Sequence, residues 1–218
     1  MNDLRIISGQ NVDLICPFPL SEIKRTYGWI HCYRTVSECD DSPKDIDSYC
    51  AMTSQYLPRV VSYGIIDKNH LTNIKHEAPL VGFVSFEPAI MPNGAVRNGF
   101  LHVATARRAW KANLIDEAGQ LVLRDLFEGI PSLLRVSAIM SDRNAPAKGL
   151  VKRLGFKFEG VTEDAILVDN SPQNMAQFGL TRRNYNLLCP QQSVASSEAS
   201  LDRPEVAQAV LETLPQQE

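Results

Sequence analysis

The sequence has no long apolar run and no excess of charge of one sign. No stretch reaches the roughly 18 apolar residues that a membrane-spanning helix needs. The first residues, MNDLRIISGQNVDLIC, are too polar for a secretory signal, so we expect a cytoplasmic location. Lys and Arg number 22 against 25 Asp and Glu, giving a net charge of −3. This balance argues against a protein that binds the phosphate backbone of nucleic acid, which needs clustered Lys and Arg, although a local basic patch is still allowed. We therefore expect no membrane and no nucleic-acid partner.

Cysteine is scarce, and its pattern argues against a disulfide scaffold. The five cysteines are odd in number and form no CxxC pair, which fits a reducing compartment. A zinc site made of His31, Cys32, Cys39 and Cys50 is conceivable. Their spacing is irregular, however, and lacks the short paired knuckle of structural zinc sites. We therefore expect no metal, and interpret the cysteines as small buried hydrophobic residues.

The end of the chain lacks aromatic residues. We expect residues 1–188 to form one domain and residues 189–218 an acidic, disordered tail. Within the tail, Asp202 and Glu205 have the spacing of a capping box. Val206, Val210, Leu211 and Leu214 fall on one helical face and are therefore compatible with a short helix over 203–214. A helix of this length is marginal in isolation, so it either frays, docks on the core or binds a partner protein.

The rest of the chain, with 44% hydrophobic and 22% charged residues overall, has the patterning of an α+β domain. The apolar periodicity predicts helices over 21–35, 111–127 and 142–154. It predicts strands over 59–66, 80–86, 96–105, 132–140, 156–160 and 179–188, with prolines ending the second of them. The acidic stretch 38–49 is expected to be a loop. The first three strands should form an antiparallel meander, and the strand–helix–strand unit over 96–140 requires a parallel pair.

One segment carries a family resemblance. RNAPAKGLVKRLGFKFEG, residues 143–160, resembles the segment of GCN5-related N-acetyltransferases (GNAT superfamily) that reads roughly N-x-x-A/S-x-x-x-x-x-K/R-x-G-F-x-x-E-G. The matching residues are Asn144, Ala147, Arg153, Gly155, Phe156, Glu159 and Gly160. The resemblance covers about residues 55–188, and the ending FGLTRRNY is similar to the branch that acetylates ribosomal-protein N-termini and small amines. Small proteins of this kind from tailed phages are also similar, in which case the host cytoplasm is expected.

The resemblance implies a mostly antiparallel central sheet with helices on both faces, and acetyl-CoA as acyl donor. It places the first cofactor motif, R/Q-x-x-G-x-G/A, on TARRAWKANLIDEAG, residues 105–119. Arg107 and Arg108 fit the arginine position and Ala112 the last small position. The glycines are absent, and Trp110 and Lys111 stand between. Arg107, Arg108 and Lys111 are expected to neutralise phosphates by side chain, since basic residues at a helix start are unfavourable without an anion.

The same resemblance suggests the remaining site residues. Asn144 would face the pantetheine arm, and a backbone N–H near Val103 or Ala104 would hold the thioester carbonyl. His102, on the central strand, is our candidate base because an imidazole titrates near neutral pH; a structural histidine is an equal alternative. Glu87 is the second candidate base. The tyrosine that serves many relatives as an acid is replaced by Val151.

Two functions therefore remain open. One is an acetyl-CoA-dependent N-acetyltransferase acting on an amine of a protein or small molecule. The alternative is a catalytically degenerate protein of the same fold that acts by binding another protein. The arginine pair and Asn144 favour the enzyme, whereas the missing glycines and tyrosine favour the binding protein.

Overall fold

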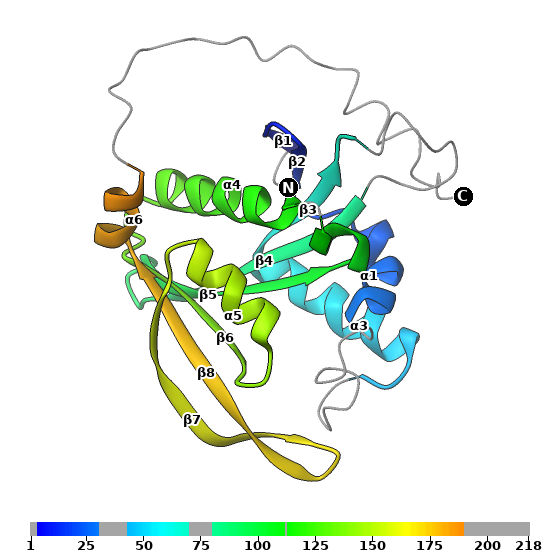
Figure 1. Cartoon of the computed structure of the whole chain (residues 1–218). Helices are drawn as coiled ribbons and strands as arrows, with labels where there is room; N and C mark the ends of the chain where they lie inside the picture. Colours follow the sequence, from blue (N-terminus) through cyan, green and yellow to red (C-terminus); the bar gives the residue numbers. More distant parts are fainter. Residues whose placement is uncertain (1–3, 31–42, 70–79, 112, 190–218) are drawn as a thin grey trace.

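A computed structural model describes residues 4–30, 43–69, 80–111 and 113–189. Its centre is an eight-stranded sheet with the order β1-β2-β3-β4-β5-β6-β8-β7 (Figure 1). The strands are β1 (Arg5–Ser8), β2 (Val12–Cys16), β3 (Val61–Asp67), β4 (Leu80–Ile90), β5 (Val96–Thr105), β6 (Arg135–Ser141), β7 (Lys157–Val168) and β8 (Ser171–Thr181). All neighbours pair antiparallel except β5 and β6, which are parallel. The predicted meander β3-β4-β5 and the predicted parallel pair are thus confirmed.

Helices cover both faces of the sheet, as predicted (Figure 1). On one face, α4 (Leu114–Gly129) and α5 (Ala145–Arg153) pack on the larger of two buried apolar clusters. On the other, α1 (Ile23–Ile30) and α3 (Ile46–Tyr56) cover the smaller cluster. The short helices η1 (Leu20–Glu22), η2 (Leu57–Arg59), η3 (Arg107–Lys111) and α6 (Arg182–Leu188) lie in the connections and at the end of β8.

The helix α5 ends as its sequence predicts. Gly155 follows it with φ +87°, a left-handed conformation that glycine adopts without steric cost. A Cβ at this position would lie 2.1 Å from Leu188 Cδ1 of α6, but this is the end of an exposed, flexible side chain that can move aside, so the backbone conformation is what favours glycine. At its other end, Asn144 caps the helix by accepting a hydrogen bond from the Ala147 N–H at 3.1 Å.

Several local predictions were wrong. The stretch 38–49 was expected to be a loop, but α3 begins at Ile46 inside it, with Asp45 as its N-cap. The strand β4 continues through Pro88 to Ile90. The last predicted strand, 179–188, is instead the end of β8 followed by α6, whose N-cap is Thr181. The hairpin β1-β2 was not predicted.

The predicted tail helix over 203–214 lies outside the described residues, as does most of the predicted tail. The candidate zinc ligands His31, Cys32 and Cys39 also lie outside them. Within the described residues, no group of three or more His, Cys, Asp or Glu side chains is placed to hold a metal ion. None of the helices described is both long and apolar enough to cross a membrane.

Candidate active site

The parallel pair β5-β6 opens at the centre of the sheet. The two strands share one registered pair, Phe100 with Ser137, and within the described residues no further pair follows toward their carboxyl ends. A cavity of about 230 Å³ lies along the part of β5 that has left β6. The gap between the strands thus creates space in the middle of an otherwise continuous sheet.

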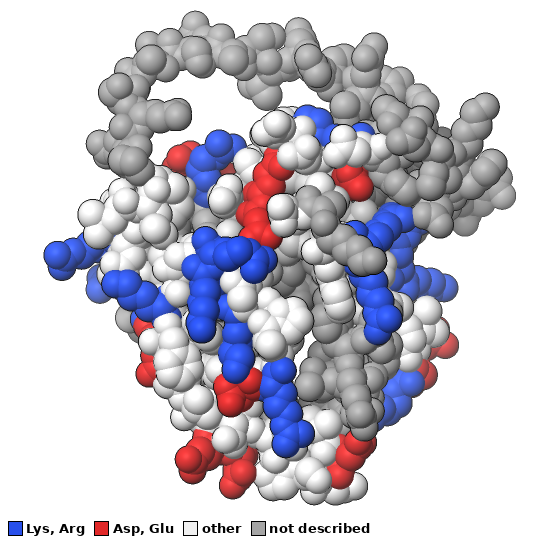
Figure 2. All heavy atoms as spheres, in the orientation of Figure 1, with Lys and Arg blue, Asp and Glu red and all other residues white. Residues whose placement is uncertain are grey.

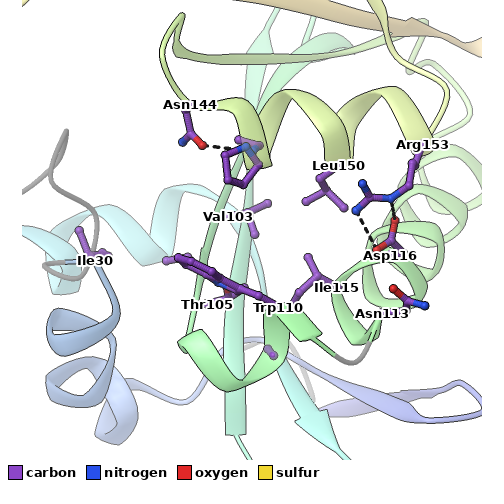
Figure 3. Close-up of a pocket in the computed structure, with 14 residues that line it drawn as sticks. Ile30, Val103, Thr105, Trp110, Asn113, Ile115, Asp116, Asn144, Leu150 and Arg153 are labelled. Atoms are coloured by element: carbon purple, nitrogen blue, oxygen red, sulfur yellow. Dashed lines mark hydrogen bonds and ion pairs between the residues drawn. The ribbon is translucent and has the colours of Figure 1, made fainter.

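The cavity is lined from several parts of the chain (Figure 3). The lining residues are Ile30, Val103, Ala104, Thr105, Ala109, Trp110, Asn113, Ile115, Asp116, Asn144, Pro146, Ala147, Leu150 and Arg153. Ala104 belongs to the apolar cluster under α1 and α3, whereas Ala147 and Leu150 pack on the cluster under α4 and α5. Because both clusters contribute, the cavity reaches toward both faces of the sheet at the strand gap.

Trp110 forms one wall of this cavity. Its indole Nε1 donates a hydrogen bond to Thr105 Oγ1 at 2.9 Å, and 43% of the residue remains exposed. Figure 3 shows the ring lying across the cavity between the end of α1 and Ile115 of α4. In the sequence, Trp110 stands where the first motif of the family has its glycines; in the structure it lines the cavity.

The loop that should hold phosphates keeps one feature of a glycine-rich loop. Asn113, the N-cap of α4, has φ 53° and ψ 10°, a left-handed conformation that favours glycine and that asparagine tolerates better than most residues. Asn113 lines the cavity, and the sequence analysis did not select it. The signal was available, since Asn is the residue that most often replaces glycine at such positions.

The basic residues of this loop differ in their surroundings. Arg107 is exposed, whereas Arg108 Nη2 donates a hydrogen bond to the Leu80 carbonyl at 3.3 Å. Lys111 ends η3, and Ala112 lies outside the described residues. The prediction that basic residues begin this helix was wrong. Arg107, Arg108 and Lys111 belong to η3, and the first turn of α4 carries Asp116 and Glu117, which suit the helix dipole.

Positive charge nevertheless gathers beside the cavity. The sequence of α5 includes Lys148, Lys152 and Arg153 and no acidic residue. Figure 2 shows basic side chains clustered over this helix, with acidic ones over the start of α4. Asn144, at the start of α5, lines the cavity and uses Oδ1 for its cap. Its Nδ2 group makes no hydrogen bond within the described part of the chain.

His102 and Glu87 form a pair on the sheet face covered by α3. His102 Nε2 lies 3.4 Å from Glu87 Oε2, and each side chain is about half exposed. Both residues are on neighbouring strands, with His102 opposite Ser85 and Glu87 opposite Phe100. Neither lines the cavity, whereas Val103 and Ala104, the neighbours of His102 along β5, both do.

Tyr56 of α3 stands beside this pair and was missed by the sequence analysis. Its hydroxyl lies 3.4 Å from Ser85 Oγ, and its ring meets the His102 imidazole edge to face at a centroid distance of 6.3 Å. Burial raises the pKa of the phenol and the nearby Glu87 carboxylate raises it further, whereas Ser85 lowers it. Tyr56 is therefore a neutral phenol at neutral pH. Because α3 itself was not predicted, no sequence signal pointed to it.

The fold was compared with known proteins. No family model matches the sequence, and no curated protein sequence does. The structure is similar to the ribosomal-protein-S5-alanine acetyltransferase from Vibrio fischeri, with a TM-score of 0.64, 12% identity, and coverage of 83% of this chain and 98% of that one. It is also similar to a probable GNAT-family acetyltransferase from Chromobacterium violaceum, with a TM-score of 0.64, 18% identity, and coverage of 83% of this chain and 88% of that one.

A third similar structure contains coenzyme A. It is the ribosomal L7/L12 α-N-protein acetyltransferase RimL in complex with coenzyme A, with a TM-score of 0.63, 12% identity, and coverage of 81% of this chain and 98% of that one. At these identities the similarity concerns the fold. The chain thus has the fold of the GCN5-related N-acetyltransferases, as the segment 143–160 predicted.

Proposed function

We propose that the protein is an acetyl-CoA-dependent N-acetyltransferase, and that the cavity at the β5-β6 gap holds the thioester end of the cofactor. The observation that carries the proposal is the gap itself, because it gives a linear ligand access to the backbone of β5 from the side of α5. The volume of about 230 Å³ is below the roughly 300–1,000 Å³ of pockets that enclose a whole ligand. It suits a narrow arm whose nucleotide end stays outside.

The lining of the cavity fits pantetheine. Its walls are largely apolar, from Val103, Ala147, Leu150 and the ring of Trp110. Asn144 offers an amide group for the polar atoms of the arm. Arg107, Arg108 and Lys111 are proposed to neutralise phosphates at the other end, Arg107 by a freely exposed guanidinium and Arg108 by rearranging from the Leu80 carbonyl. Ala112 is proposed as the small residue beside them.

Acetyl-CoA supplies an activated acyl group when it is bound. A backbone N–H at Val103 or Ala104 is proposed to donate a hydrogen bond to the carbonyl oxygen, where negative charge develops during attack by an amine. As the nitrogen–carbon bond forms, the carbon–sulfur bond would break and CoA would leave as its thiolate, while the amine loses one proton. His102, one residue from this backbone and on the opposite face of the strand from Val103, is proposed to accept that proton, with Glu87 as the second acceptor.

The acceptor is proposed to approach from the side of α3, where Tyr56, Glu87 and His102 meet. We propose an amine of a protein or small molecule, because the similar structures include acetyltransferases of ribosomal proteins. Cytoplasmic action is the matching proposal. The alternative, a protein-binding role without catalysis, is favoured by one observation: Val151, at the position of the usual acid, is buried and carries no proton donor.

Calorimetry with acetyl-CoA and CoA tests the proposal. We expect micromolar binding, weakened about tenfold by Arg107→Ala with Arg108→Ala, since a charge-assisted hydrogen bond is worth about 1.4 kcal/mol or more. Arg97→Ala is the matched control, because Arg97 is an exposed arginine near the opposite end of β5. No binding at millimolar cofactor would contradict the proposal and leave the protein-binding alternative.

A further inference from the structure

One ion pair lies across an end of the cavity. Arg153, the last residue of α5, donates from Nε to Asp116 Oδ1 at 2.6 Å and from Nη2 to Asp116 Oδ2 at 3.0 Å. Both residues line the cavity, and Figure 3 shows them at the side away from Asn144, with the guanidinium turned toward α4. The geometry is the two-pronged pairing that makes an arginine–carboxylate contact specific.

The position of Asp116 matters because of what surrounds it. It lies in the first turn of α4, where backbone N–H groups and the helix dipole attract an anion. Within the described residues, Asp116 and Arg153 are the two charged residues of the cavity lining. The Asp116 carboxylate therefore occupies the end of the cavity that attracts anions, and it pairs with Arg153, the arginine of the cavity lining.

Arg153 also lies where two cavities meet. It lines a second cavity, of about 470 Å³, together with Glu117, Arg124 and Tyr185. The Arg153 side chain is 60% exposed and that of Asp116 is 22% exposed. An ion pair with so exposed an arginine is weak in water, and its guanidinium can move without disturbing packed atoms.

We infer that the Asp116–Arg153 ion pair, here called the clasp, lowers the affinity of the site for the phosphate groups of CoA. When CoA binds, Arg153 leaves Asp116 and pairs with a phosphate of the cofactor. The inference rests on the proposed function and adds to it: affinity for the phosphate end is held down by the chain's own carboxylate. Phosphate-free pantetheine, which does not require Arg153, is not subject to the clasp.

The test compares CoA with pantetheine by calorimetry in four proteins: wild type, Asp116→Asn, Arg153→Gln and the double variant. Asp116→Asn is expected to tighten CoA about threefold to tenfold by releasing Arg153 and removing a like charge. Arg153→Gln is expected to weaken CoA by a similar factor. In the Arg153→Gln background, Asp116→Asn is expected to raise CoA affinity less than it does in the wild type, because no arginine is released. Pantetheine affinity should stay constant throughout.

Glu159→Gln is the matched control. Glu159 forms the same type of two-pronged pair with Arg135, in which each side chain is about one-third exposed, and neither residue lines the cavity. This variant removes one negative charge and one ion pair but should leave CoA affinity unchanged. Thermal unfolding of each variant checks that it is folded, and Arg153→Gln tests the clasp independently of Asp116→Asn.

The outcomes separate the two claims. CoA binding by the wild type that Asp116→Asn leaves unchanged or weakens would overturn the clasp and leave the proposed function standing. If Asp116→Asn raised CoA affinity equally in the wild type and in the Arg153→Gln background, the clasp would also be overturned. The effect would then come only from repulsion between the Asp116 carboxylate and the phosphates. Absence of CoA binding in every variant would overturn the proposed function and the clasp together.

Discussion

Trp110 and Thr105 are joined by a hydrogen bond of 2.9 Å from the indole Nε1 to the threonine Oγ1. This bond ties η3 to the end of β5 and fixes the ring as a wall of the cavity. A side chain held in this way loses little further freedom when a ligand packs on it. The wall is therefore preorganised, and both residues can be tested separately.

The first prediction concerns this wall. Trp110→Ala should weaken CoA binding by about 1 kcal/mol, or roughly fivefold, because the ligand loses an aromatic surface. Thr105→Val keeps the shape of the residue and removes the acceptor of the indole hydrogen bond, so its effect should be smaller. Calorimetry measures both affinities. An unchanged affinity in Trp110→Ala would mean that the cofactor does not contact this wall.

The second prediction concerns proton transfer. His102→Ala should lower kcat by about 10²-fold or more, while the Kd for CoA stays within about twofold, because His102 does not line the cavity. Glu87→Gln should lower kcat less. The rate of acetyl transfer to a peptide or small amine is measured at saturating acetyl-CoA. Equal losses in CoA affinity and rate would point instead to a structural role of the pair.

The third prediction tests the loop conformation at Asn113. With φ 53°, alanine at this position should lower the free energy of unfolding by about 1 kcal/mol relative to glycine. Asn113→Gly and Asn113→Ala both remove the amide group, so their difference reports on the backbone alone. Urea unfolding of the two variants measures it. Equal stability would contradict the left-handed conformation.

The fourth prediction concerns a polar cluster between β1, β3 and α4. Asp125 forms an ion pair with Arg5 and accepts a hydrogen bond from the Tyr63 hydroxyl at 2.7 Å. Burial acts to raise the pKa of Asp125, but the hydrogen bonds from Arg5 and Tyr63 outweigh it, and the pKa is lowered overall. Asp125→Asn should therefore cost about 2 kcal/mol of stability at neutral pH.

The sign of the pH dependence follows from this shift. Because the folded-state pKa of Asp125 is below the ordinary value of about 3.9, its contribution is fully present above that pH and is lost as the pH falls through the folded-state pKa. The stability difference between wild type and Asp125→Asn should hence shrink below roughly pH 4. Urea unfolding at neutral and acid pH measures the difference. A gap that does not narrow in acid would contradict the assigned ionisation.

Much of the sheet was predictable because its strands and helices carry strong periodic signals. The strand Val96–Thr105 was predicted with its observed bounds. The helices α4 and α5 end within two residues of the C-terminal ends predicted for them. Gly155 marked the C-terminal end of α5, because a glycine stop has a local physical cause. The start was predicted at residue 142, whereas the observed N-cap is Asn144.

Other elements depend on contacts distant in the sequence. Every residue of β2 is buried, including Asp13, so the strand shows no alternation of polar and apolar side chains. The helix α3 buries Tyr49 and Thr53, but it begins inside the acidic stretch 38–49, whose composition favoured a loop. Pro88 lies beyond Phe86, the last residue of β4 registered with β3, where a missing N–H interrupts no pairing with that strand.

Some residues of the candidate site could likewise be predicted from the sequence, and others could not. Asn144, Val103 and Ala104 were found from the motif and its neighbouring strand, and all three line the cavity. Trp110 was noticed as a residue that stands in place of the glycines, and Asp116 was not considered, although both line the cavity. Their roles depend on where η3 and the end of α5 lie in space, which a motif aligned along one chain does not contain.

A structure of the protein determined with acetyl-CoA would show where the cofactor binds. We expect the thioester in the gap between β5 and β6, its carbonyl oxygen within hydrogen-bond distance of a backbone N–H at Val103 or Ala104, and the pantetheine arm beside Trp110 and Asn144. Acetyl-CoA bound at another surface, or a gap that stays closed to it at saturating concentration, would contradict the proposed function.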